Sequence, residues 1–267
     1  MAVENLQEGC IEMPALLEIK GLTKFFGGLA AVSHLDMSVD EGEIVGLMGP
    51  NGAGKTTIFN LITGIFRPSS GQVIFQGREI GGKKPHFVAA CGIGRTFQFA
   101  YLFPDFTVLE NVVASFHLNP KCGVLEGLFN TRAYRRKEAR ISDEAMEILQ
   151  LVGLAREKDI LGRNLPHGPQ KLLTMARALA IRPKLLLLDE PIGGMHFDEV
   201  NQAISAIERI RSQGTTIVLV EHNMRLMRLC ERIVVMDFGE KIAEGTYEEV
   251  KSHKQVMRAY FGSEYVA

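Results

Sequence analysis

The chain has 267 residues, 46% of them hydrophobic, and its 30 basic and 31 acidic residues give a formal net charge of −1. This length and composition allow a sizeable buried core in one or two domains. The near-zero charge gives no electrostatic reason to expect a nucleic-acid partner, because such proteins usually carry a basic excess on one face.

Export and membrane-span signals are missing from the sequence pattern. Residues 1–15 contain acids and no basic stretch leading into a long apolar run, so we expect an N-terminal extension rather than a secretory signal. Nowhere do about 18 consecutive apolar residues occur, which predicts a protein that docks on a membrane if it works at one. Cys10, Cys91, Cys122 and Cys230 lack paired metal-ligand spacing, which predicts reduced thiols.

The first part of the chain predicts strands, a glycine-rich loop and a helix. From Leu16, two apolar-rich stretches are broken at Gly27, where glycines permit a turn, so we expect an antiparallel hairpin. Residues 43–49 have the pattern of a buried strand and run directly into a glycine-rich segment. The apolar spacing after it predicts a helix that ends near Gly64.

The rest of the chain predicts a largely helical stretch and then alternating strands and helices. Charged residues between apolar ones at helical spacing indicate helices over most of 108–161. Further predicted elements are a helix over 171–181, a strand over 185–189, a helix from about 200 to 212 and a strand over 215–221. We therefore expect an α/β fold with a mixed, mostly parallel sheet flanked by helices, an antiparallel β portion and a helical subdomain.

A phosphate-binding loop is predicted between the strand at 43–49 and the helix that follows. The pattern G-x-x-x-x-G-K-[ST] is matched by Gly49, Pro50, Asn51, Gly52, Ala53, Gly54, Lys55 and Thr56, with Thr57 beside them. Small residues let successive backbone N–H groups face phosphate oxygens, and the helix adds the positive end of its dipole. Lys55 would reach the β- and γ-phosphates, and Thr56 would ligate Mg2+. An accidental glycine-rich turn does not explain the Lys-Thr pair.

Two carboxylates end the predicted strand over 185–189. Asp189 and Glu190 follow four leucines, and a buried acid requires a cation nearby. Asp189 would hold Mg2+, directly or through water, and Glu190 would polarise the attacking water as general base. The alternative is an acidic pair that only caps the next helix.

Together these motifs resemble the ATPases of ABC (ATP-binding cassette) transporters from residue 16 to residue 262. The resemblance implies a single P-loop ATPase domain that uses ATP and Mg2+, with its helical subdomain at roughly 99–180 and a helical tail over 246–267. Phe26 resembles the aromatic residue that stacks on adenine, although a core phenylalanine is the alternative. Gln98 resembles the Q-loop glutamine, which touches Mg2+ and water and couples the site to the permease. His222 resembles the switch histidine that contacts the γ-phosphate.

The signature segment departs from the family. Where the family has Leu-Ser-Gly-Gly-Gln, or Leu-Ser-Tyr-Gly-Gln-Gln in branched-chain amino-acid importers, this chain has Leu165, Pro166, His167, Gly168, Pro169 and Gln170. The resemblance implies that Leu165, Gly168 and Gln170 contact ATP bound to the opposite subunit. Prolines suit a first helical turn but donate no N–H. We therefore expect the site that this signature caps to be the weaker one of a heterodimer.

The D-loop departs as well, because Met195, His196 and Phe197 stand where leucine followed by aspartate or asparagine is commoner. By resemblance, His196 is a nucleotide contact. Lys55, Glu190 and His222 are expected to remain competent if the partner's signature is intact. A non-hydrolysing regulatory subunit is the alternative that these departures keep open.

Five segments resemble the longer ATPase of branched-chain amino-acid importers. They are FGGLAAV, GRTFQ, TVLENV, VEHNM and IAEGTYEEVKSHKQVMRAYFG. This implies a second ATPase subunit, two membrane permease subunits and an extracytoplasmic solute-binding protein, with the chain at the cytoplasmic face of the inner membrane. A homodimer stays open, as do urea, amides or aromatic acids as solutes, an exporter, and a role without a membrane. Residues 98–109 are a candidate permease-docking surface, with helical core as the alternative.

Overall fold

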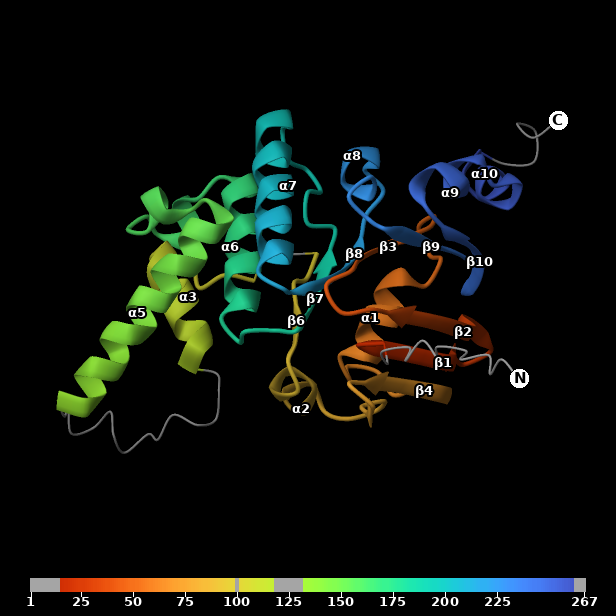
Figure 1. Cartoon of the computed structure of the whole chain (residues 1–267), viewed down its shortest axis with the longest axis horizontal. Helices are drawn as coiled ribbons and strands as arrows, with labels where there is room; N and C mark the ends of the chain where they lie inside the picture. Colours follow the sequence, from red (N-terminus) through yellow and green to blue (C-terminus); the bar gives the residue numbers. More distant parts are fainter. Residues whose placement is uncertain (1–14, 99–100, 118–131, 262–267) are drawn as a thin grey trace, which may run out of the picture.

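The computed structural model describes residues 15–98, 101–117 and 132–261 (Figure 1). Most of the predicted N-terminal extension, the end of the predicted tail, Cys10 and Cys122 lie outside these residues, as do residues 99 and 100 of the candidate docking surface. Within the described ranges, no helix is both long enough and apolar enough to cross a bilayer.

An antiparallel sheet forms the first layer. Its strand order is β2-β1-β4-β5, where the strands are β1 (Leu17–Phe26), β2 (Leu29–Val39), β4 (Ser70–Phe75) and β5 (Arg78–Glu79). The β1–β2 hairpin turns at Gly27, whose φ of 58° is in the region that glycine adopts without a Cβ penalty. The predicted hairpin is confirmed.

A mostly parallel sheet forms the second layer, in the order β10-β9-β3-β8-β7-β6. Its strands are β3 (Ile44–Met48), β6 (Ile93–Arg95), β7 (Leu185–Asp189), β8 (Thr216–Val220), β9 (Arg232–Asp237) and β10 (Glu240–Gly245). Only the β9–β10 pair among these strands is antiparallel. The mixed sheet that the alternation predicted is therefore present.

Both faces of this second sheet are buried, which explains the unbroken leucine run of β7. Leu185 and Leu187 pack in the core shared with the antiparallel sheet and α1 (Lys55–Ile62), while Leu186 and Leu188 pack in the core on the opposite face. Alternate side chains of a strand point to opposite faces, so a strand covered on both sides is apolar throughout.

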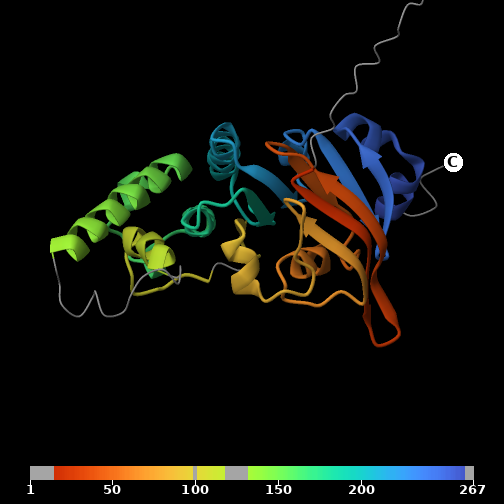
Figure 2. The ribbon, with the colours of Figure 1, turned by 60° about the horizontal axis from the view of Figure 1, so that its bottom comes forward.

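Most other helices lie at the β6–β7 end of the second sheet or beside β9 and β10 (Figures 1 and 2). The other helices are α2 (Pro85–Ala90), α3 (Val108–His117), α5 (Arg132–Val152), α6 (His167–Leu179), α7 (Phe197–Ser212), α8 (Met224–Met227), α9 (Tyr247–Ser252) and α10 (Lys254–Phe261). Helices α3, α5 and α6 contact one another, and α7 contacts α5 and α6. Two short 3-10 turns, Ala155–Glu157 and Gly162–Asn164, lie between α5 and α6.

Two helix starts differ from the sequence prediction. Helix α7 begins at Phe197 rather than near residue 200, because the Glu199 carboxylate accepts the backbone N–H of His196 at 2.9 Å and closes the first turn. Helix α6 begins at His167 rather than 171 and includes Pro169 in its first turn, where a missing N–H breaks no intrahelical bond.

Candidate functional site

The glycine-rich loop joins the end of β3 to the start of α1 and is packed too tightly for side chains at two of its glycines. Gly49 has a φ of 152°, and a Cβ there would lie 2.2 Å from the carbonyl oxygen of Met236. Gly54 has a φ of 100°, and its Cβ would lie 2.3 Å from the carbonyl oxygen of Ala31. The loop backbone is thus held against β9 and β2 at the N-terminus of a helix, an arrangement that fits a phosphate.

Lys55 lies across this loop. Its Nζ donates to the carbonyl oxygens of Gly49, at 2.6 Å, and Pro50, at 2.9 Å. Burial lowers the pKa of Lys55, and the nearby carboxylates of Glu190 and Asp189 oppose that shift. Thr56 is exposed and Thr57 is half-buried at the start of α1. Within the described ranges, the hydrogen-bond partners of this ammonium group are carbonyl oxygens, and two carboxylates lie near it. Such a group suits a site that receives anionic oxygens and a cation together.

Asp189 ends β7 and is paired with an arginine that the sequence analysis missed. Arg95 Nη2 lies 3.1 Å from Asp189 Oδ2, and the two side chains are only 5% and 4% exposed. Arg95 also donates to Asn60 Oδ1 at 2.7 Å. Burial raises the pKa of Asp189, and Arg95 opposes that shift. The cation expected beside this buried acid is therefore, in part, the side chain of Arg95. Arg95 ends β6, the strand next to β7, and this position is the signal that could have identified it.

Glu190 follows in a strained backbone conformation. Its φ of 47° is rare for a residue with a Cβ and costs on the order of 1–3 kcal/mol. Gln98 Nε2 donates to Glu190 Oε2 at 2.9 Å, so the structure brings these two predicted residues together. Buried Lys171, also missed, donates to the backbone oxygens of Gln98 and Glu190 and ties both segments to α6. A lysine in an otherwise apolar helix face was its only sequence signal.

His222 follows β8, and its side chain is 71% exposed. The buried Glu221 carboxylate holds the surrounding loop, because it accepts the backbone N–H groups of His222 at 3.0 Å, Asn223 at 3.2 Å and Ile192 at 3.2 Å. A carboxyl group that accepts several backbone N–H bonds fixes the geometry of that backbone well. The imidazole is thereby presented to the solvent side while its backbone is anchored beside the segment after Glu190.

Phe26 lies at the hairpin end of β1 and is 43% exposed, so the core alternative does not hold. Its ring packs edge-on against Phe66 at a centroid distance of 5.2 Å, and Lys24 Nζ lies 5.1 Å from the centroid. A partly exposed ring of this kind offers a face for stacking.

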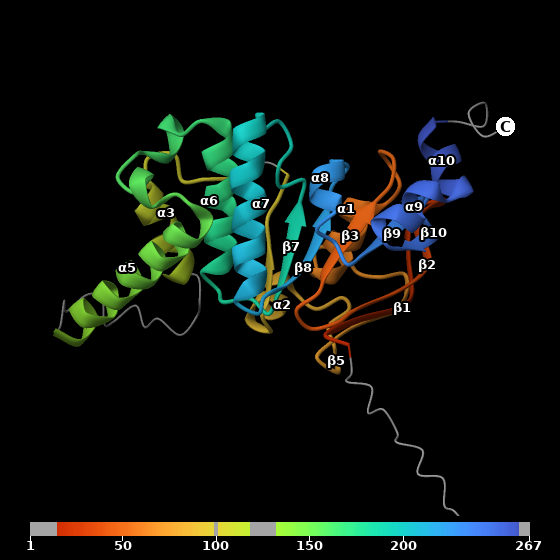
Figure 3. The ribbon, with the colours of Figure 1, turned by 45° about the horizontal axis from the view of Figure 1, so that its top comes forward.

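The signature and the D-loop pack on each other within the chain. A Cβ at Gly168 would lie 2.4 Å from the carboxyl group of Glu199, and one at Gly194 would lie 3.1 Å from the His167 ring. Leu165 is buried, and its carbonyl oxygen accepts from Gln170 Nε2 at 2.9 Å. Helices α6 and α7 lie on the other side of β7 and β8 from α1 (Figure 3). The signature and His196 are thus not brought to the phosphate loop of the same chain.

Comparisons with known proteins agree with these motifs. A family described as ABC transporter matches residues 32–193, and one described as branched-chain amino acid ATP-binding cassette transporter matches residues 240–266. The chain is 39% identical over 249 residues to the high-affinity branched-chain amino acid transport ATP-binding proteins LivG of Salmonella typhimurium and BraF of Pseudomonas aeruginosa. In both cases 92% of this chain and 98% of the relative are covered.

A solved structure, the ADP conformation of an ATP-binding cassette of an ABC transporter, superposes with a TM-score of 0.82 at 30% identity. The match covers 94% of this chain and 100% of that chain. The resemblance drawn from the motifs and the α/β fold with its antiparallel portion are confirmed. One family fits the loop at 49–56, the carboxylates of Asp189 and Glu190 at the end of β7, and the match over nearly the whole length. The chain belongs to the ATP-binding cassettes of ABC transporters, which bind and hydrolyse ATP.

Proposed function

We propose that this chain is the ATP-hydrolysing motor subunit of an importer for branched-chain or other hydrophobic amino acids. The observation that carries the ATPase assignment is the cluster of Lys55, Gln98, Asp189 and Glu190 beside the glycine loop. The solute class is supported by the family match over residues 240–266 and by the names of the relatives. Urea, amides and aromatic acids are the alternative solutes that a transport assay has to separate.

In this mechanism the loop from Gly49 to Thr57 cradles the β- and γ-phosphates, and Lys55 exchanges its two carbonyl acceptors for phosphate oxygens. Thr56, Gln98 and Asp189 would hold Mg2+, which neutralises phosphate charge when bound. Glu190, oriented by the Gln98 amide, accepts a proton from the attacking water. His222 faces the γ-phosphate, and the ring of Phe26 stacks on adenine.

The signature and the D-loop would contact the nucleotide bound to a second ATPase subunit. The contacting residues would be Leu165, Gly168 and Gln170 of the signature and His196 of the D-loop. Their distance from this chain's own loop across β7 and β8 supports that division (Figure 3). We infer a heterodimer that works with two permease subunits and an extracytoplasmic solute-binding protein at the cytoplasmic face of the inner membrane. Pro166 and Pro169 donate no N–H, so the site that they cap is the weaker one.

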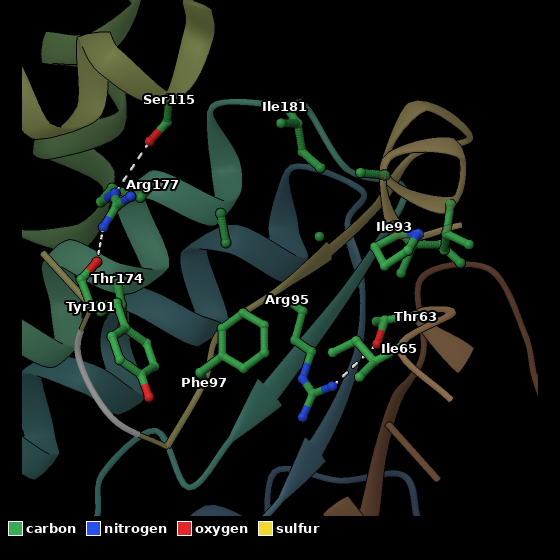
Figure 4. Close-up of a pocket in the computed structure, with 15 residues that line it drawn as sticks. Thr63, Ile65, Ile93, Arg95, Phe97, Tyr101, Ser115, Thr174, Arg177 and Ile181 are labelled. Atoms are coloured by element: carbon green, nitrogen blue, oxygen red, sulfur yellow. Dashed lines mark hydrogen bonds between the residues drawn. The ribbon is translucent and has the colours of Figure 1, made fainter. Parts of the chain in front are cut away.

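The permease would dock at a cavity of about 290 Å³ between the sheet and the helical part of the chain (Figure 4). Its wall includes Val88, Ile93, Phe97 and Tyr101. Phe97 is 44% exposed and Tyr101 is 71% exposed, which supports docking over the helical-core alternative for this stretch. Phe97 in the cavity wall directly precedes Gln98 in the chain, so a docked segment could act on the Gln98–Glu190 contact.

Steady-state phosphate release from MgATP tests the proposal, with the purified chain alone and mixed with its partner ATPase. We expect hydrolysis that rises on mixing, and Glu190→Gln in this chain should lower it by roughly tenfold or more, because the general base is lost and only the weaker site still works. Lys55→Ala should in addition weaken ATP binding. Nucleotide binding without hydrolysis in both preparations would instead favour a regulatory subunit.

A further inference from the structure

The docking cavity contains an arginine that has no acidic partner among the residues that the structure describes. Arg177 projects from α6 into the cavity wall, half-buried (Figure 4). Burial lowers its pKa, and within the described part of the chain no carboxylate opposes that shift. Arg95, which lines the same cavity, differs in this respect because Asp189 offsets its desolvation. In this cavity, the cost of burying the Arg95 guanidinium group is thus offset by a carboxylate, whereas among the described residues that of Arg177 is not.

All the described contacts of Arg177 are with neutral groups. Its Nε donates to Ser115 Oγ at 3.3 Å, and Nη1 donates to the backbone oxygen of Tyr101 (Figure 4). The guanidinium carbon also lies 4.8 Å from the centroid of the Phe103 ring. A guanidinium group has five N–H donors, so these contacts leave donors for a further acceptor. Among the residues that the structure describes, no aspartate or glutamate forms an ion pair with it.

A planar guanidinium group in an apolar wall favours one kind of partner. Carboxylates bind arginine through two parallel N–H···O bonds, and the attraction strengthens when a docked segment excludes water. The backbone oxygen of Tyr101 and the hydroxyl of Ser115 fix the orientation of the group, so little side-chain freedom is left to lose on binding.

We propose that the permease segment that docks in this cavity carries an aspartate or glutamate side chain that pairs with Arg177. This inference rests on the docking site described under the proposed function and names the chemistry by which it recognises its partner. The apolar residues of the wall supply contact area, and the ion pair fixes the register of the segment.

Charge reversal tests the pairing. The chain is co-expressed with the two permease subunits of its own transporter, and the complex is purified in detergent and quantified. Arg177→Glu should lower the association by roughly tenfold to a hundredfold. In that background, single Asp or Glu→Arg changes are made in the cytoplasmic loops of the permease, and one of them should restore association. Arg156→Glu, a reversal at an exposed arginine of the same helical part, should change nothing.

ATP binding by each free variant checks that it folds. Association that Arg177→Glu leaves unchanged, or that no permease reversal restores, would overturn the ion pair while the docking site stands. A wild-type chain that does not associate with the permease subunits would overturn the proposed function, and the inference with it. Arg177→Lys keeps the charge without the planar fork and should give an intermediate loss.

Discussion

At the scale of single residues, the buried pair of Arg95 and Asp189 makes a sharp prediction about stability. Arg95→Met removes the ion-pair partner of the Asp189 carboxylate at the end of β7, in a position that is 4% exposed. We expect it to lower the free energy of unfolding by about 3–5 kcal/mol, measured by urea denaturation without nucleotide. The double variant Arg95→Met, Asp189→Asn removes both charges and should recover much of that loss. Equal losses in both variants would show that packing, not charge, dominates.

The thiol of Cys230 provides a prediction about pH. Burial, with Glu231 and Glu43 nearby, raises the pKa of this thiol from 9.0 to about 12. Because the folded state holds the proton more tightly, stability falls as pH rises from about 9 towards 12, and the thiol stays neutral at pH 8.5. Iodoacetamide at pH 8.5 should therefore modify half-exposed Cys91 and leave Cys230 intact until urea unfolds the chain. Mass spectrometry reads the result, and rapid native labelling of Cys230 would contradict it.

Sequence reasoning found the residues that sit in short motifs and missed those that act across the fold. Lys55 belongs to the glycine-rich motif, and Asp189 and Glu190 directly follow a leucine run. The spacing within each short motif is enough to indicate these residues. Arg95 reaches Asp189 over a separation of 94 residues, and Lys171 reaches Gln98 over 73. Such pairs exist only because β6 lies beside β7 and α6 crosses behind them, which periodicity does not reveal.

At the scale of an element, two glycines of the phosphate loop allow the cost of backbone strain to be measured apart from the cost of a steric clash. Gly52 and Gly54 have similar positive φ values, 84° and 100°, but a Cβ at Gly52 meets nothing within 4 Å whereas one at Gly54 meets the carbonyl oxygen of Ala31 at 2.3 Å. Gly52→Ala should lower the free energy of unfolding by about 1 kcal/mol from strain alone. Gly54→Ala adds the displacement of β2 and should lower it by about 3 kcal/mol or more.

Thermal and urea unfolding without nucleotide measure both effects, so any clash with a bound phosphate does not enter. Similar losses for the two variants would mean that the loop shifts freely and that the contact with β2 does not constrain it.

Element types were predictable where one physical pattern dominated. The leucine run of β7 indicated a strand buried on both faces, and alternate leucines do enter the two cores. Helix α7 starts about three residues before the position that its apolar periodicity predicts, because His196 and Glu199 close the first turn before that periodicity begins. A cap formed by a histidine backbone and a carboxylate leaves a weaker sequence signal than a Ser or Thr cap does.

At the scale of the whole molecule, the chain separates its phosphate loop from its signature by the width of the central strands (Figure 3). Under the proposed function, one copy therefore holds two halves of different sites. The half that contains Lys55, Glu190 and His222 has the expected residues, whereas the half that begins α6 has prolines at 166 and 169. Gly168 has no side chain and lies against Glu199, so the start of α6 stays close to the first turn of α7 despite the two prolines.

This asymmetry predicts unequal activities for two mixed heterodimers. Glu190→Gln in this chain disables the site that the partner's signature caps, and steady-state phosphate release should fall by roughly tenfold or more. The same change at the corresponding glutamate of the partner ATPase disables the site under this chain's signature and should leave most of the activity.

Replacing Pro166 by Ser and Pro169 by Gln restores a hydroxyl and an N–H donor, so it should raise the activity of the dimer in which only the weaker site works. Equal rates for the two mixed dimers would show that the start of α6 supports hydrolysis without those donors, through the positive end of its helix alone.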